Sequence, residues 1–183
     1  MRSGMMTKLY IFSKILTFPG AYLRGFWEQL TCKLLGLPVE TPGYLRIDEA
    51  CGHVEHALAE KSGAAYLIAT GPGFMNLMTG FPIFLMGYVN IAVMGISFSD
   101  SPALFIFYAV MMYLGISLLC SLFPLVEDAL TLHEAVFSKG KTNIVAKILM
   151  AIPSLITTIC AYLEKYCIPF IFWIAVIVTA FIF

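Results

Sequence analysis

The sequence contains few charged residues and no excess of either sign. Only 12% of its 183 residues are Asp, Glu, Lys or Arg, and 11 basic residues are balanced by 11 acidic ones. Soluble domains carry about 25% charged residues, so this composition argues against a soluble globular protein. The neutral balance leaves no basic surface of the kind that binds nucleic acid, and we expect no nucleic-acid partner.

The sequence also lacks the motifs of several common chemistries. It has no glycine-rich phosphate loop, no paired-cysteine metal motif and no nucleophile elbow. Five cysteines are present, but Cys120, Cys160 and Cys167 lie in or beside apolar segments, and Cys32 and Cys51 have no close partner in sequence. We therefore expect buried apolar thiols rather than a disulfide framework.

Apolar residues are abundant: 60% of the chain is hydrophobic, and the mean hydropathy is +0.89. An α-helix of about 20 apolar residues crosses the hydrocarbon core of a bilayer. We predict a mainly α, polytopic integral membrane protein, with residues 1–183 forming one membrane domain of four or five membrane helices in a lipid bilayer. The first membrane segment is expected to be a long helix that is broken or tilted near Pro82. The predicted segments are residues 63–98, 103–126, 144–163 and 168–183.

The first third of the chain is more polar. Residues 8–36 are interpreted as an amphipathic helix, with Lys8 and Lys14 on its wet face, followed by a second helix that either lies on the membrane or spans it. Residues 41–56 alternate around a turn and favour a small β-hairpin at the membrane surface. The lysines of residues 139–147 predict that this loop faces the cytoplasm.

Three groups of polar residues are candidates for a functional site. In the first, Arg24 and Glu28 lie four residues apart, on one face of a helix, where their side chains can pair. The second is the neighbourhood of Glu49, His53, Glu55, His56 and Glu60, and the third is Glu127 with Asp128, after a long uncharged run. If the second segment is helical, Glu49, His53, His56 and Glu60 share one face and, with Asp128, would suit zinc. If the segment is a strand, as we prefer, His53 and His56 point to opposite faces and this cluster does not form.

Four short blocks resemble motifs of the site-two-protease-like integral membrane metalloproteases, in particular a poorly characterised branch with the pattern PGxxxHExxH. The blocks are PGAYLRGFWEQLTCKLLGLPV at 19–39, GHVEH at 52–56, GPGFMN at 71–76 and FPLVEDAL at 123–130. The resemblance implies a site-two-protease-like core in a bacterial or archaeal inner or cell membrane. In that family the two histidines bind zinc, the glutamate is the general base, and an aspartate in the last block is the third ligand.

This chain departs from that zinc motif. Arg24 stands at the first histidine position, Gly25 at the glutamate position and Glu28 at the second histidine position. Asp128 alone remains as a ligand. Because arginine keeps its proton and glycine cannot transfer one, the family's hydrolysis is not expected here, and Arg24, Glu28 and Asp128 are predicted to form a buried ion-pair triad at the former active site.

Three functions follow as hypotheses. The first is a non-catalytic pseudoprotease without a cofactor, which binds a partner protein or membrane segment in a retained groove. The second is an active zinc-dependent intramembrane metalloprotease with a relocated site at His53, His56 and Asp128, with Glu49 as a further candidate ligand or base. The third is a structural subunit of a larger membrane complex. The groove candidates are Tyr44, Arg46, His53, Glu55 and Asn76.

Overall fold

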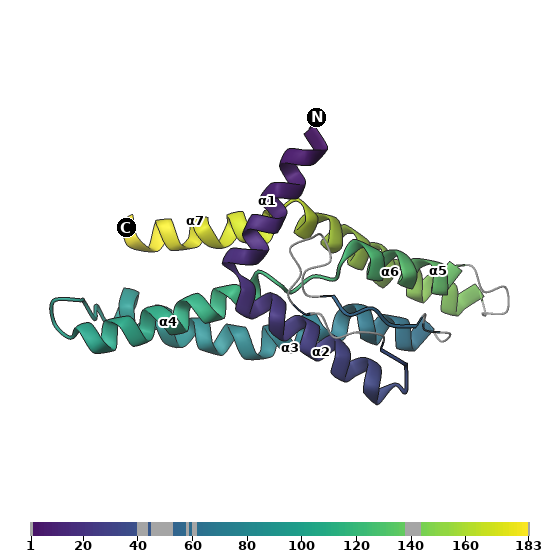
Figure 1. Cartoon of the computed structure of the whole chain (residues 1–183), viewed down its shortest axis with the longest axis horizontal. Coiled ribbons are helices and arrows are strands. Elements are labelled where there is room, and N and C mark those ends of the chain that lie inside the picture. The colour runs from purple at the N-terminus through teal and green to yellow at the C-terminus, as the bar shows by residue number, and fades with distance from the viewer. Residues whose placement is uncertain are drawn as a thin grey trace.

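A computed structural model describes residues 2–39, 44, 53–57, 59, 62–137 and 144–182. Within these ranges the chain is mainly helical and contains no extended strand (Figure 1). The helices are α1 (Arg2–Leu16), α2 (Phe18–Leu34), α3 (Ser62–Tyr88), the π-helix η1 (Val89–Val93), α4 (Pro102–Leu119), α5 (Val126–Phe137), α6 (Ile144–Lys165) and α7 (Ile168–Ile182).

The helices α3 and α4 form a long antiparallel pair (Figure 1). Ser62–Val93, which joins α3 to η1, and Pro102–Leu119 are the two helices in the described ranges that are long and apolar enough to cross a membrane. Parts of α6 and α7, Met150–Lys165 and Ile168–Thr179, pass the same test together but meet at a bend of 65°. The described ranges therefore contain two or three candidate spans, and the predicted four or five are not confirmed.

The helices differ from the predicted apolar segments in two places, and no break occurs at Pro82. The long helix α3 continues through Pro72 and Pro82, and its regular geometry changes only at the π-helix Val89–Val93. Neighbouring helices can cover the backbone groups that a proline frees, so a proline does not always end a membrane helix. The predicted segment 103–126 instead ends at Leu119, and an irregular stretch leads into α5.

Small residues bring the backbones of α3 and α4 close together. A Cβ atom added to Gly115 would lie 2.4 Å from the backbone nitrogen of Phe84, and one added to Gly87 would lie 2.6 Å from the carbonyl oxygen of Tyr108. In lipid, where apolar side chains gain little by associating, such close packing is a main source of helix affinity. The C-terminal α7 covers the pair by packing Trp173 against Phe84, with ring centroids 4.9 Å apart.

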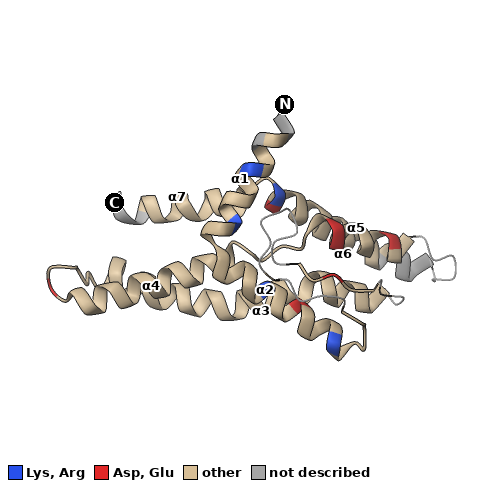
Figure 2. Ribbon diagram, viewed as in Figure 1, with Lys and Arg blue, Asp and Glu red and all other residues tan. Residues whose placement is uncertain are grey.

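Most charged residues of the described chain lie away from the α3–α4 pair. Figure 2 shows them over α1, α2, α5 and α6, whereas the α3–α4 pair carries charge only in its connecting loop. The predicted wet-face position of Lys14 is wrong: this residue is buried and its ammonium pairs with Glu164 of α6. Lys8 is exposed, as expected.

The predicted surface hairpin at 41–56 falls mostly outside the described residues. The described part contains one isolated antiparallel bridge, between Val39 and His56. The lysine loop used to predict orientation also lies largely outside the described ranges.

We expect Gly115→Ala to lower the free energy of unfolding by about 1–3 kcal/mol, because the new methyl group meets the backbone of Phe84. Gly63→Ala is the matched control, since a Cβ atom there has nothing within 4 Å. Thermal unfolding in detergent, followed by circular dichroism, measures both. Equal melting temperatures for the two variants would contradict this account of the helix contact.

Candidate functional site

The buried face of α2 brings two charged side chains into the interior. Pro19 lies in the first turn of the helix, and Gly36, at φ +69°, follows its end. Gly20 lies so close to α4 that its backbone N–H donates to Ser117 Oγ at 2.8 Å. This close approach buries Arg24, which is 1% exposed, and Glu28, which is 0% exposed.

Arg24 is shared between two carboxylates from different helices. Its Nη2 atom lies 3.5 Å from Asp128 Oδ2 in α5, and its Nη1 atom lies 3.4 Å from Glu164 Oε1 in α6. Nη1 also donates a short hydrogen bond to the carbonyl oxygen of Phe123. Arg24 thus joins α2 to the α4–α5 connection, α5 and α6.

Glu28 has different partners from those expected. Its Oε1 atom accepts the backbone N–H of Val54 at 3.0 Å and lies 2.7 Å from His53 Nδ1. Among the described residues, the predicted triad is therefore realised only in its Arg24–Asp128 half, because Glu28 pairs with His53. His53 Nδ1 is also 3.6 Å from Asp128 Oδ1, so this imidazole lies between the two carboxylates.

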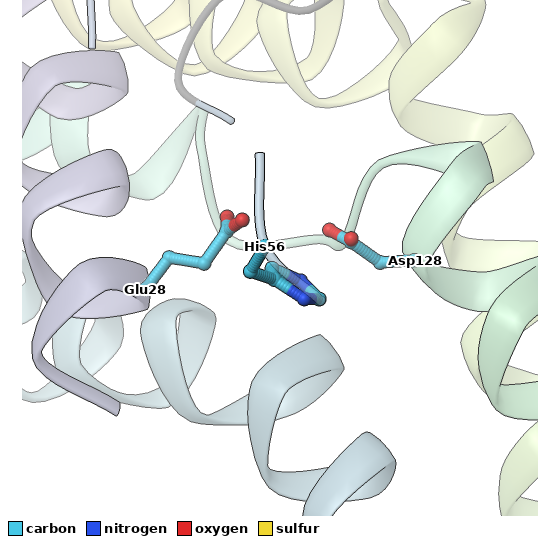
Figure 3. A group of neighbouring side chains, drawn as sticks. All are labelled: Glu28, His56 and Asp128. Carbon is cyan, nitrogen blue, oxygen red and sulfur yellow. The ribbon is translucent and has the colours of Figure 1, made fainter. Parts of the chain in front are cut away.

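A second histidine completes a cluster of metal-ligand type. Glu28, His56 and Asp128 each offer one ligand atom, and these atoms all lie within 4.8 Å of one another. Figure 3 shows the His56 imidazole between the Glu28 and Asp128 carboxylates. Glu28 Oε2 and His56 Nε2 are buried without a hydrogen-bond partner in the described structure. The cluster thus presents two unpaired electron donors.

The hydrogen bonding of His56 sets its tautomer. Its Nδ1 atom lies 2.9 Å from the carbonyl oxygen of Ala57, which can only accept, so Nδ1 carries the proton. In the neutral ring the lone pair is therefore on Nε2. Metal-binding histidines are commonly fixed in this way, with the other ring nitrogen donating to a carbonyl or carboxylate.

The expectation that His53 and His56 diverge is wrong. Their ring centroids are 5.9 Å apart, and both rings lie beside the same carboxylates. Side chains alternate between opposite faces only in a regular strand, whereas residues 53–57 are irregular apart from the single bridge at His56. The helical arrangement is not formed at 53–57 either, and Glu49 and Glu60 lie outside the described residues.

Burial shifts the protonation of two groups. Burial, together with the neighbouring Glu28 carboxylate, raises the pKa of Asp128 from 3.8 to about 6, although His53 and Arg24 act in the opposite direction. Burial alone would lower the pKa of His53, but its contacts with Glu28 and Asp128 outweigh burial, and the pKa is raised. Both shifts favour retaining a proton between the carboxylates.

The remaining predicted site residues are dispersed. Gly25 lies under the ring of Tyr44, which donates a short hydrogen bond to Gln29. Asn76 is fully buried and donates to the carbonyl oxygens of Gly20 and Ser121, so it does not line an open groove. Glu55 is exposed, and Arg46 lies outside the described residues.

Sequence reasoning missed Lys14 and Glu164. They are 150 residues apart, and their side chains pair in the interior. Glu164 and its neighbour Lys165 lie alone between two charge-free stretches. A charged residue isolated in apolar sequence indicates a functional or paired buried charge, and this was the available signal.

No protein-family model, curated protein or solved structure matches the chain. The likeness to site-two-protease-like proteins therefore stays a prediction, and the chemistry of the site is derived from its own residues.

We expect the Arg24–Asp128 contact to be energetically coupled. Arg24→Met leaves two buried carboxylates without their guanidinium and should cost about 3–5 kcal/mol. Once Asp128→Asn is present, the further cost of Arg24→Met should be smaller. Chemical unfolding of both single variants and the double variant measures the coupling, and strictly additive effects would count against the pair.

The raised pKa values predict that stability falls as pH rises. Between pH 3.8 and about 6 the folded chain retains a proton on Asp128 that the unfolded chain releases, so this stabilisation is lost as pH rises through about 6. His53 acts in the same direction above its ordinary pKa of about 6.5. In metal-free protein, Asp128→Asn should flatten the decline in melting temperature between pH 4 and 6, and Asp100→Asn, in an exposed loop, is the control variant.

Proposed function

We propose that the chain is a membrane-embedded divalent-cation-binding protein without protease activity. The proposal rests on one cluster: Glu28, His56 and Asp128, from three separate segments, bring ligand atoms within 4.8 Å of one another. Two atoms of this cluster, Glu28 Oε2 and His56 Nε2, are buried and have no hydrogen-bond partner in the described structure. Unpaired buried polar atoms are costly, and a bound cation would satisfy both of them.

The donor set suits zinc. Zinc accepts imidazole nitrogen and carboxylate oxygen ligands at about 2.0–2.2 Å, usually in tetrahedral geometry. Such bonds place ligand atoms about 3.4 Å apart, so the three side chains would close on the ion by about 1 Å. His53 Nδ1, which lies 2.7 Å from Glu28 Oε1 and 3.6 Å from Asp128 Oδ1, is the natural fourth donor.

The surroundings of the cluster support binding without hydrolysis. A zinc hydrolase needs a general base next to the metal. At position 25, a Cβ atom would lie 2.8 Å from Cδ1 of Tyr44, so a glutamate there has no room while Tyr44 keeps its place. This crowding favours metal binding without hydrolysis, which departs from the cofactor-free pseudoprotease predicted from the sequence.

The hydrolytic alternative is the second candidate, because His53, His56 and Asp128 do lie together. It requires a general base outside the ligand set, and the described carboxylate nearest to His56 in sequence is the exposed Glu55. Incubating the zinc-loaded protein with transmembrane peptides tests this alternative, and zinc-dependent cleavage would support it. Capture of a partner protein, or membership of a larger complex, stays a prediction from the sequence.

We expect the purified chain, in detergent, to bind one zinc ion. His56→Ala and Asp128→Asn should each weaken binding by at least about 100-fold, beyond the 10–100-fold typical of outer-shell partners. The control is His133→Ala, which removes the third histidine of the chain, on α5, where it contacts Ser154 instead of the cluster. Competition with a zinc-sensitive dye measures the affinities.

Two results would overturn the proposal. One is a wild-type chain that takes up no zinc. The other is an equal loss of affinity in His133→Ala and His56→Ala, which would show that binding depends on histidines in general and not on this cluster.

A further inference from the structure

Two buried charged residues next to the cation site take no part in the proposed ligand set. Lys14 of α1 pairs with Glu164 of α6, and each side chain is 4% exposed. The Lys14 ammonium also donates to Ser121 Oγ at 3.3 Å. Burying such an ion pair costs desolvation free energy. Glu164 also lies 3.4 Å from Arg24, which links the pair to the guanidinium.

Glu164 and Arg24 both form hydrogen bonds with the backbone of Phe123. Glu164 Oε2 accepts the N–H of Phe123 at 2.9 Å, and the carbonyl oxygen of Phe123 accepts Arg24 Nη1. Phe123 precedes Pro124, which keeps this backbone out of a helix and leaves both of its polar groups available. The contacts form a closed ring that fixes where the guanidinium lies.

Arg24 is held between two carboxylates without closing on either. Its distances of 3.4 Å to Glu164 and 3.5 Å to Asp128 exceed the roughly 2.7–2.9 Å of charge-assisted hydrogen bonds. If Glu164 lost its charge, Asp128 would be the remaining carboxylate within 4 Å of the guanidinium among the described residues. Arg24 would then close on Asp128 and occupy an oxygen that the cation needs.

Charge balance leads to the same conclusion. Lys14 and Arg24 are matched by Glu164 and Asp128, which leaves the charge of Glu28 for His53 or a bound cation. Neutralising Glu164 adds one net positive charge to this buried set, whereas neutralising Lys14 removes one. The two changes should therefore move cation affinity in opposite directions.

We infer that Glu164 is a positioning residue of the cation site: it draws Arg24 away from Asp128, while Lys14 competes for Glu164 and weakens that pull. The inference rests on the proposed zinc binding. Zinc affinity would then depend on Glu164 of α6, which is linked to the metal-binding residue Asp128 only through Arg24.

The test measures zinc affinity of the full chain in detergent, by dye competition, for four variants. Glu164→Gln should bind about 10–100-fold more weakly than wild type. Lys14→Met should bind at least as tightly as wild type, and Arg24→Met more tightly. In the Arg24→Met background, adding Glu164→Gln should cause a much smaller loss than it does in wild type, because Arg24, through which Glu164 acts, is gone and only the change in net charge remains.

A purely structural role for Glu164 gives a different pattern. It would weaken zinc binding equally in both backgrounds, and Lys14→Met would weaken binding as Glu164→Gln does; either result overturns the inference. If Glu164→Gln does not fold, the zinc affinities of Lys14→Met and Arg24→Met still test the inference. Tenfold weaker zinc binding than wild type in either variant contradicts the positioning role. A wild type that binds no zinc refutes the proposed function itself, whereas zinc binding unaffected by Glu164→Gln refutes only the positioning role.

Discussion

The buried guanidinium of Arg24 is the constraint on which the polar half of the molecule depends. An arginine cannot shed its charge when it is buried, so the fold must supply acceptors around it. It does so from three places: the carbonyl oxygen of Phe123, Glu164 in α6 and Asp128 in α5. Each acceptor fixes a different segment against α2, which explains why helices that are far apart in sequence converge here.

This arrangement depends on the apolar half of the structure. The close α3–α4 pair presents a rigid surface, and Gly20 of α2 approaches it so closely that an added Cβ atom would lie 1.9 Å from the carbonyl oxygen of Ser117. The end of α4 at Leu119, followed by Pro124, then releases backbone groups that Arg24 and Glu164 bind. Helix packing and the ionic network thus meet in the short connection between α4 and α5.

The network also gives the proposed cation site its character. Glu28 and Asp128 lie on either side of the histidines, and the pKa of Asp128 is raised, so either a proton or the proposed metal ion would relieve the repulsion between the two carboxylates. A neighbouring arginine would oppose metal binding if Asp128 were its sole partner. In the proposed arrangement Arg24 is shared between Asp128 and Glu164, and this sharing would set how much negative charge a cation meets.

Composition and charge-free stretches alone determined that the chain is helical and apolar enough for a membrane, because both follow from hydrophobicity and the length of a helix. The spacing of Arg24 and Glu28 likewise placed them on one helix face. Only the tertiary structure decided that Glu28 pairs with His53, that Lys14 turns inward to Glu164, and that His53 and His56 converge on Asp128. Helix periodicity describes one segment at a time, whereas the partner of a buried charge is set by whichever distant segment packing brings within a few ångströms.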